Sequence, residues 1–435
     1  MSSTLGGEMA EAHSAGPRLG ISERTLLFLI TAVQFINVLE FMIVSPLGPD
    51  FAKDLGISLS QLGLLGGSYT ASAAIAGALG SKYLDRFDRR TALGTALAGL
   101  VFSTALAGFA KDLVTLMAAR VLAGIFGGPA SSVALAVIAD VVPSRRRGQA
   151  LGMVMSGFAA ASVFGVPLSL ELARQVNWRA PFFAVALLGA VVGIFAITSL
   201  PELRLHMHVS GERSRIFDFL GERAVLFSLS ATFSVMVSSF CIIPNLSAYL
   251  QHNCGYPRSQ LSFLYLIGGS VSFVVTRIVG GYVDRIGGTR IAAVGSGLFV
   301  LVLIPLFILE QRWLSSLLAF SLFMAATAIR NVSINALTSR VPQPHERARF
   351  MSLQSAMQHL AAAGGAGLGS LLLSELPNGQ LGGMPRVAAI SVAFAALLPG
   401  LLWQVERVIR ARRPSLPEPW MNTLEATRSS FPPPV

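Results

Sequence analysis

Charged residues are scarce in this sequence. Asp, Glu, Lys and Arg supply 13% of its 435 residues, whereas soluble globular proteins typically contain roughly 25%. Hydrophobic residues supply 53%, and the mean hydropathy is +0.64. A shortage of charge over this length excludes an ordinary soluble protein and favours a protein that crosses a membrane many times.

Residues that commonly build catalytic or cofactor sites are also few. None of the three lysines, at positions 53, 82 and 111, follows a glycine. A phosphate-binding P-loop needs a Gly-Lys pair, so direct use of ATP by this chain is excluded. We interpret Cys241 and Cys254 as neither metal ligands nor disulfide partners. Because no cluster of His, Asp, Glu or Cys falls at one depth, we expect no cofactor, no metal site and no enzymatic activity.

Long apolar runs fill most of the chain. Each is about 20 residues or longer, the length that an α-helix needs to cross a bilayer. Backbone groups inside lipid must hydrogen-bond within their own segment, so these runs predict helices. The ten-residue alternation typical of a transmembrane barrel is not seen. The twelve runs span residues 25–48, 60–80, 91–110, 113–138, 149–172, 180–200, 224–250, 259–283, 288–309, 313–338, 348–374 and 386–409.

Basic residues are divided unevenly between the two sides of the membrane. If both termini are cytoplasmic, the cytoplasmic segments carry 23 Lys and Arg residues and the outside loops carry 7. Cytoplasmic loops of membrane proteins are enriched in these residues. We therefore expect a multi-pass protein of the cell (cytoplasmic or inner) membrane with both termini in the cytoplasm. The net charge of +11 follows from this asymmetry and does not indicate nucleic-acid binding.

The two halves of the chain repeat one another. At a constant offset of 199 residues, Phe41 aligns with Phe240, and Ser-Gln-Leu at 60–62 aligns with the same triplet at 259–261. Matches in polar loops are not explained by chance similarity between apolar helices, so two parallel six-helix units with a substrate path between them are predicted. The predicted parts are a cytoplasmic tail (1–24), a first bundle (25–200), a cytoplasmic linker (201–223), a second bundle (224–409) and a disordered cytoplasmic tail (410–435).

Several motifs resemble those of the major facilitator superfamily, and the resemblance covers residues 25–409. The stretch "SKYLDRFDRR" (81–90) is similar to the family signature G-x-L-x-D-R-x-G-R-R, and "GGYVDRIGGTR" (280–290) is its second copy. Arg120 with Gly124 is similar to the R-x-x-x-G motif of the fourth helix. The resemblance implies an all-α membrane protein with twelve transmembrane helices in two six-helix pseudo-repeats, the major facilitator fold.

The fifth apolar run resembles one branch of this superfamily. Gly165 and Pro167, followed by Trp178-Arg179, are similar to the G-x-P-x-G and W-R signature of drug:proton antiporters and their sugar-efflux relatives. Ser169 stands where the signature has its last glycine. Gly and Pro also kink membrane helices for structural reasons alone. The resemblance implies export in exchange for protons.

The charged loops imply a gate at the cytoplasmic side. By resemblance, Asp85 faces the start of the eleventh helix, and Arg89 pairs with Asp140 at the inner end of the fourth. Such a cluster would hold the two halves together and release them as they rock apart. The alternative is that these charges only set the topology. The implied gate residues are Asp85, Arg86, Arg89, Arg90, Asp140, Asp284 and Arg285.

Glu40 is the one acidic residue that lies well inside an apolar run. An acid at the bilayer centre costs roughly 2.5–3.5 kcal/mol and is by default a functional candidate with a partner. Arg120 lies at nearly the same depth in the fourth run, and the first and fourth helices line one cavity in the family fold. We hypothesise that Glu40 carries a coupling proton and that Arg120 sets its proton affinity. A static ion pair that holds the two helices together is the alternative.

Further polar residues inside the runs are candidates for the substrate cavity. Gln34, Asn37 and Glu40 fall within about 120° of one helix face, which we expect to look into the cavity rather than toward lipid. His359 could titrate near neutral pH or be a packing histidine, and Arg330 could bind an anionic substrate, pair or snorkel. The cavity candidates are Gln34, Asn37, Asn245, Asn331, Gln358, His359 and Arg330.

The sequence therefore predicts a monomeric secondary transporter that works by alternating access. Its expected partners are a small-molecule substrate, protons and the lipid bilayer. Export of a small organic molecule by proton antiport is favoured. Uptake by symport or uniport, and a non-transporting sensor or assembly protein of the same fold, are the alternatives.

Overall fold

The computed structural model describes residues 22–84, 87–142, 144–200, 222–310, 315–342 and 347–412. In this part the protein is almost entirely helical, and its two short strands, β1 (Ser374–Glu375) and β2 (Leu381–Gly382), pair into an antiparallel hairpin. The first half contains α2 (Glu23–Met42), α3 (Val44–Leu55), the 3-10 turn η1 (Leu59–Gln61), α4 (Leu62–Leu84), α5 (Arg89–Gly108), α6 (Leu113–Val141), α7 (Ser144–Ala160), the π-helical η2 (Ala161–Gly165), α8 (Val166–Gln175) and α9 (Ala180–Ser199).

The second half follows the same order. It contains α11 (Arg223–Phe240), α12 (Ile243–His252), the 3-10 turn η4 (Arg258–Gln260), α13 (Leu261–Ile286), α14 (Gly288–Leu303), the π-helical η5 (Ile304–Ile308), α15 (Ser316–Thr338), α16 (Arg347–Leu372) and α17 (Met384–Arg412).

Ten segments of the described residues are long and apolar enough to cross a membrane. The other two predicted spans are α4 and α16, which have 23 and 26 residues and so also have the length of a span. They lie against each other where the halves meet, and a Cβ on Gly63 of α4 would come within 2.5 Å of the Ala366 carbonyl oxygen in α16. A helix that packs against other helices need not be apolar on every face, which explains their lower hydropathy. The prediction of two six-helix pseudo-repeats is confirmed.

The first helix of each half is broken at a corresponding place. α2 ends at Met42 and α3 resumes at Val44, while α11 ends at Phe240 and α12 resumes at Ile243. Prolines explain the breaks, because Pro46 and Pro244 each lack an N–H and clash with the carbonyl four residues earlier. At the offset of 199, these breaks fall within two residues of each other.

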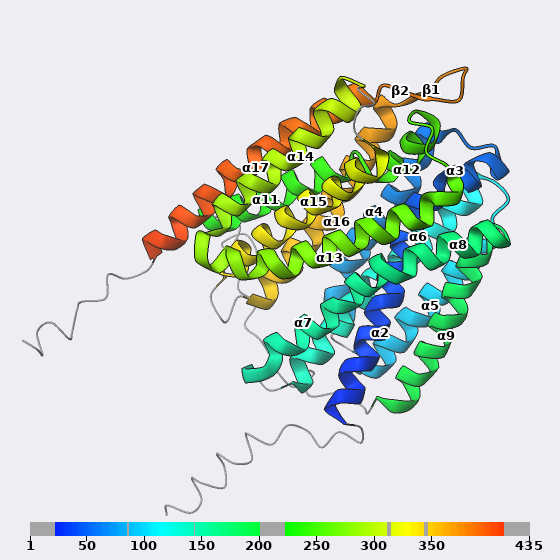
Figure 1. Cartoon of the computed structure of the whole chain (residues 1–435). Coiled ribbons are helices and arrows are strands. Elements are labelled where there is room, and N and C mark those ends of the chain that lie inside the picture. The colour runs from blue at the N-terminus through cyan, green and yellow to red at the C-terminus, as the bar shows by residue number, and fades with distance from the viewer. Residues whose placement is uncertain are drawn as a thin grey trace, which may run out of the picture.

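The two ends of the molecule differ. α2 begins and α17 ends at one end, which we call the terminal end, and the β1–β2 hairpin lies at the opposite end, the hairpin end (Figure 1). Toward the hairpin end, helices from the two halves pack together in three places: α3 on α12, α4 on α16, and η2 with α8 on α13. These contacts place the junction between the halves beside the buried polar residues of α2 and α6.

Candidate functional site

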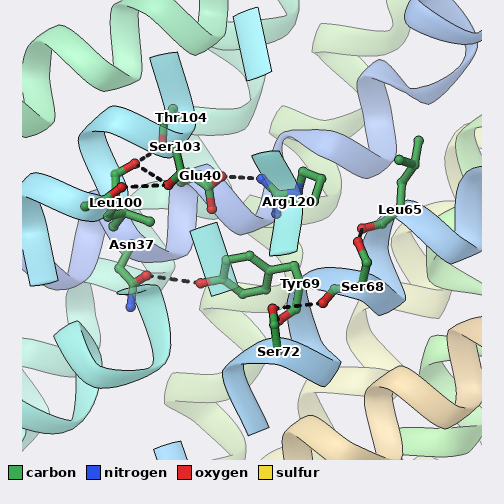
Figure 2. Close-up of polar contacts among 11 residues, drawn as sticks. Asn37, Glu40, Leu65, Ser68, Tyr69, Ser72, Leu100, Ser103, Thr104 and Arg120 are labelled. Carbon is green, nitrogen blue, oxygen red and sulfur yellow. Dashed lines mark hydrogen bonds and ion pairs between the residues drawn. The ribbon is translucent and has the colours of Figure 1, made fainter. Parts of the chain in front are cut away.

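Glu40 and Arg120 meet inside the first half. Both side chains are fully buried, and Arg120 Nη1 donates to Glu40 Oε1 (Figure 2). The Arg120 guanidinium carbon also lies 4.8 Å from the centre of the Tyr69 ring, a cation–π contact. Three helices thus supply the site: α2 carries the carboxylate, α6 the guanidinium and α4 the ring.

A chain of hydrogen bonds continues from Tyr69 along α2. The Tyr69 hydroxyl donates to Asn37 Oδ1 at 3.1 Å (Figure 2). Asn37 Nδ2 donates to Ser131 Oγ at 2.5 Å and to the Gly127 carbonyl at 2.9 Å. Ser131 donates in turn to Gln34 Oε1 at 3.2 Å. The predicted polar face of α2 is therefore one connected network, and it is packed against α6 and α4 with Gln34 and Asn37 both less than 7% exposed.

Glycines of α6 make this approach possible. A Cβ on Gly124 would lie 2.2 Å from the Tyr69 carbonyl oxygen, and a Cβ on Gly127 would lie 2.4 Å from the Tyr69 hydroxyl and 2.8 Å from Asn37 Oδ1. Any larger residue would separate α6 from α4 and displace the ring. The R-x-x-x-G motif thus has a direct use here: the arginine enters the site, and the glycine one turn later lets Tyr69 lie beside it.

The pair leaves several polar atoms without protein partners among the described residues. These atoms are Glu40 Oε2, Arg120 Nε and Arg120 Nη2. Buried polar groups are almost always hydrogen-bonded in proteins, and exceptions mark functional or strained places. Proton transfer at Glu40 Oε2, or an acceptor on a substrate that engages Arg120, is chemistry that this arrangement can support.

The helix-5 motif connects this site to the other half of the molecule. A Cβ on Gly165 would lie 2.7 Å from Leu39 Cδ1, so this glycine lets the π-helical η2 pack beside the residue that precedes Glu40. Pro167 lies in the first turn of α8, and η2 directly precedes it. On its other side η2 contacts α13, where a Cβ on Gly269 would come within 2.7 Å of the Ser162 carbonyl oxygen.

The Trp178-Arg179 part of the motif holds the C-terminal end of α3. The Trp178 indole nitrogen donates to Asp54 Oδ2 at 2.8 Å, and Arg179 Nη1 donates to the same oxygen at 2.6 Å. These two hydrogen bonds, first that of Trp178 and then that of Arg179, hold the pKa of the Asp54 carboxyl below its usual range. The motif thereby fixes α3 to the turn between α8 and α9.

The remaining cavity candidates lie in the second half. Asn245 of α12 is fully buried, and its amide atoms have no hydrogen-bond partner in the described part of the chain. Asn331, Gln358 and His359 are half-buried on α15 and α16. Arg330 is fully buried, but its guanidinium points into the second bundle, toward α11 and α14. The structure therefore does not group these residues around Glu40.

The implied cytoplasmic gate is described only in part. Arg89 Nε donates to Asp140 Oδ2 at 3.0 Å, which is the pairing that the family resemblance implied. This ion pair joins α5 to α6 within the first half. Arg90 is half-buried and Arg285 is exposed. Asp85, Arg86 and the side chain of Asp284 lie outside the described residues.

Polar contacts across the hairpin end were not anticipated from the sequence. Arg258 forms a bidentate ion pair with Asp50, with Nε 2.8 Å from Oδ1 and Nη2 2.5 Å from Oδ2. Glu375 of β1 accepts hydrogen bonds from the Ser58 hydroxyl and the Leu59 backbone N–H, both at 2.9 Å. We call these two contacts the hairpin-end latch. Tyr69 and Ser131 were missed as well. Ser131 lies two turns after Gly124 of the R-x-x-x-G motif, whereas no motif of the sequence analysis points to Tyr69.

The fold and this buried pair define a class of protein, a multi-pass membrane transporter built from two helical bundles. The family model of the Major Facilitator Superfamily matches residues 30–229 and again 228–432. The chain belongs to the Major Facilitator Superfamily. Members of this family carry small-molecule substrates and are transporters rather than enzymes.

Relatives and solved structures agree with this assignment. The chain is 25% identical to the uncharacterized MFS-type transporter YbcL of Bacillus subtilis, over 85% of this chain and 94% of the relative. It is also 25% identical to the multidrug resistance protein MdtG of Proteus mirabilis, over 80% and 89% of the two chains. A D-xylose-proton symporter structure shares the fold with a TM-score of 0.70 and 18% identity, over 87% of this chain and 96% of the symporter.

Proposed function

We propose that this transporter exports a small organic molecule in exchange for protons, and that Glu40 carries the proton. The observation behind the proposal is a fully buried carboxyl paired with Arg120, whose guanidinium lies over the Tyr69 ring. Replacing a buried ion pair with well-packed apolar residues is often neutral or stabilising, so stability alone gives no reason to keep the pair. Relatives named as a multidrug resistance protein and a chloramphenicol resistance protein support export and an organic substrate.

Coupling follows from two states of the pair. In one state Glu40 is ionised and bound by Arg120, and in the other Glu40 is protonated and the guanidinium turns to a substrate or to water. One pH unit across the membrane is worth about 1.4 kcal/mol per proton, and about 2.3 kcal/mol is added per charge for each 100 mV. A single proton exchanged for each substrate is therefore sufficient for export against a gradient of tenfold or more.

The helix-5 motif could transmit a change at Glu40 to the second half and so to the rocking of the two halves. Leu39, next to Glu40, packs on Gly165 of η2, and η2 packs on Gly269 of the second half. A change in the position of α2 when Glu40 gains or loses its proton would reach the second half through these two contacts. We infer that Gly165 and Gly269 keep this path close-packed.

We further propose that the terminal end faces the cytoplasm and that the hairpin-end latch closes the outer side. The excess of Lys and Arg in the segments at the terminal end supports this orientation. The latch joins α3 to η4 and β1 to η1, so each of its contacts bridges the two halves. It must break when substrate leaves toward the outside.

Reversing one charge of the latch should favour its opening. Arg258→Asp places two carboxylates in contact at a pair whose side chains are only about a quarter exposed. Removing a surface ion pair costs about 0.2–1 kcal/mol, and like charges repel by a similar amount. We expect the population open at the hairpin end to rise about three- to tenfold. Spin labels on Lys53→Cys and Asn378→Cys, in a chain without Cys241 and Cys254, would report the distance between halves.

The double reversal Asp50→Arg with Arg258→Asp is the matched control, because it restores opposite charges. It should return the distance distribution to that of the parent chain. If the single and double reversals gave the same distribution, the latch would have no part in closing this end.

The proposed function is tested by flux in membrane vesicles of known orientation. Everted vesicles with an acidic interior are supplied with chloramphenicol or a lipophilic cationic dye, and internal pH and substrate are followed together. Antiport predicts that substrate enters the vesicle while protons leave. Substrate movement that is unaffected by collapsing the pH difference and the potential would refute proton coupling, and movement of both in one direction would show symport.

A further inference from the structure

A second arginine, Arg330, is buried in the other half, and its neighbours are a serine and a phenylalanine. Arg330 of α15 is fully buried, its Nη2 donates to Ser238 Oγ of α11, and its guanidinium carbon lies 4.1 Å from the centre of the Phe299 ring of α14. Ser391 of α17 donates to the Ser238 backbone carbonyl. The guanidinium therefore lies between α15, α11 and α14 of the second bundle, away from the Glu40–Arg120 pair, and α17 is bonded to Ser238 beside it.

Arg330 lacks the counter-charge that Arg120 has. Glu40 neutralises Arg120, and the position that corresponds to Glu40 in the second half is Ser239. Within the described residues, no carboxylate forms an ion pair with Arg330, and its Nε and Nη1 have no hydrogen-bond partner. A cation held in a low-dielectric interior requires compensation, since desolvation of an unpaired charge is strongly unfavourable.

The groups shown beside the guanidinium are the Ser238 hydroxyl, which accepts from Nη2, and the face of the Phe299 ring. Ser296 of α14 is 4% exposed, and its hydroxyl has no partner among the described residues. Ser296 and Phe299 are three residues apart, so they share one face of α14. Gly295 makes room for the arginine, since a Cβ there would lie 3.1 Å from Arg330 Cγ. The ring offsets part of the charge, but the N–H groups of Nε and Nη1 still have no acceptor among the described residues.

We propose that Arg330 holds a small monovalent anion inside the second bundle, with Arg330 Nε and Nη1 and the Ser296 hydroxyl as donors. A positive charge with unused donors selects for an acceptor of negative charge. Full burial within the second bundle limits the ligand to the size of a halide or of a single small carboxylate. This site does not depend on the proposed function, because it lies within one bundle and does not involve Glu40.

The anion compensates the charge of Arg330 and so stabilises the bundle. A ligand that binds the folded state and not the unfolded state raises apparent stability with its concentration. The thermal unfolding midpoint of the purified full-length protein should therefore rise, and saturate, with chloride at constant ionic strength. Large gluconate, which cannot enter, should have no such effect.

Direct binding is measured by broadening of the ³⁵Cl NMR line in the presence of the protein. Arg330→Gln should abolish both the broadening and the chloride-dependent rise, while Arg330→Lys should keep a weakened response. The double variant Glu40→Gln with Arg120→Gln, which removes the charges of the other buried pair, should respond to chloride like the parent chain. Formate in place of chloride distinguishes a carboxylate source of the anion from a halide.

The outcomes separate clearly. Stabilisation by chloride or by formate that depends on Arg330 supports the site and identifies its ligand. Equal unfolding midpoints in chloride, formate and gluconate, with no line broadening by the parent chain, would overturn the proposal. A response that survives in Arg330→Gln would overturn it too, because the anion would then bind elsewhere.

Discussion

Glu40→Gln is expected to abolish uphill transport while leaving substrate binding and downhill exchange in place. Glutamine has the shape of the protonated carboxyl and still accepts a hydrogen bond from Arg120, but it cannot release a proton. With one proton exchanged per substrate, a pH difference of one unit supports about a tenfold substrate gradient, and the variant should support none. Substrate accumulation in vesicles at several pH differences measures the effect, and the pH dependence of transport should become flat.

Glu171→Gln is a suitable control, since Glu171 is a partly exposed carboxylate in the middle of α8 that pairs with Arg174. It should transport like the parent chain. Glu40→Asp should retain coupling at a lower rate, because it keeps a titrating carboxyl but shortens its reach to Arg120. Proton-coupled accumulation by Glu40→Gln at the parent level would show that the pair is only structural.

The position of each residue along its apolar run was sufficient to predict the contact between Glu40 and Arg120. Glu40 lies eight residues before the end of the predicted run 25–48, and Arg120 lies seven residues after the start of the run 113–138; the structure brings the two together. The three-residue spacing of Gln34, Asn37 and Glu40 places them on one helix face, and that this face lines a substrate cavity stays a prediction. What that face contacts depends on how α2 is rotated in its bundle, and the structure turns it onto α6 and α4.

Rotation about a helix axis also explains why Arg330 was placed in the cavity as a candidate. An apolar helix shows no clear polar stripe, so the direction of a single arginine is not readable from its neighbours. The direction of the Tyr69 side chain is not readable from its neighbours either. Its ring lies beside Arg120 because Gly124 lets α4 and α6 pack closely. The hairpin-end latch joins Asp50 to Arg258 across 208 positions, and no local pattern links such distant loops.

Arg120→Gln is expected to be strongly destabilising unless Glu40 is changed with it. Removing one partner of a buried ion pair leaves the other charge uncompensated and typically costs 3–5 kcal/mol. We expect the free energy of unfolding in detergent to fall by about 3 kcal/mol. The double variant Glu40→Gln with Arg120→Gln buries no charge here, so it should recover more than half of that loss.

The amount of stability that the double variant recovers tells whether Glu40 and Arg120 interact directly or whether each substitution merely disturbs the packing of the bundle. Residues in contact show coupling of about 0.5–3 kcal/mol in a double-mutant cycle, and distant residues show almost none. Arg330→Gln combined with Glu40→Gln should therefore be additive, since Arg330 lies in the other bundle.

Arg277→Gln, at an exposed arginine of α13, should change stability by less than about 0.5 kcal/mol. Additive losses for Glu40 and Arg120 would mean that the two charges do not compensate each other, and the proton-binding role of Glu40 would lose its physical basis.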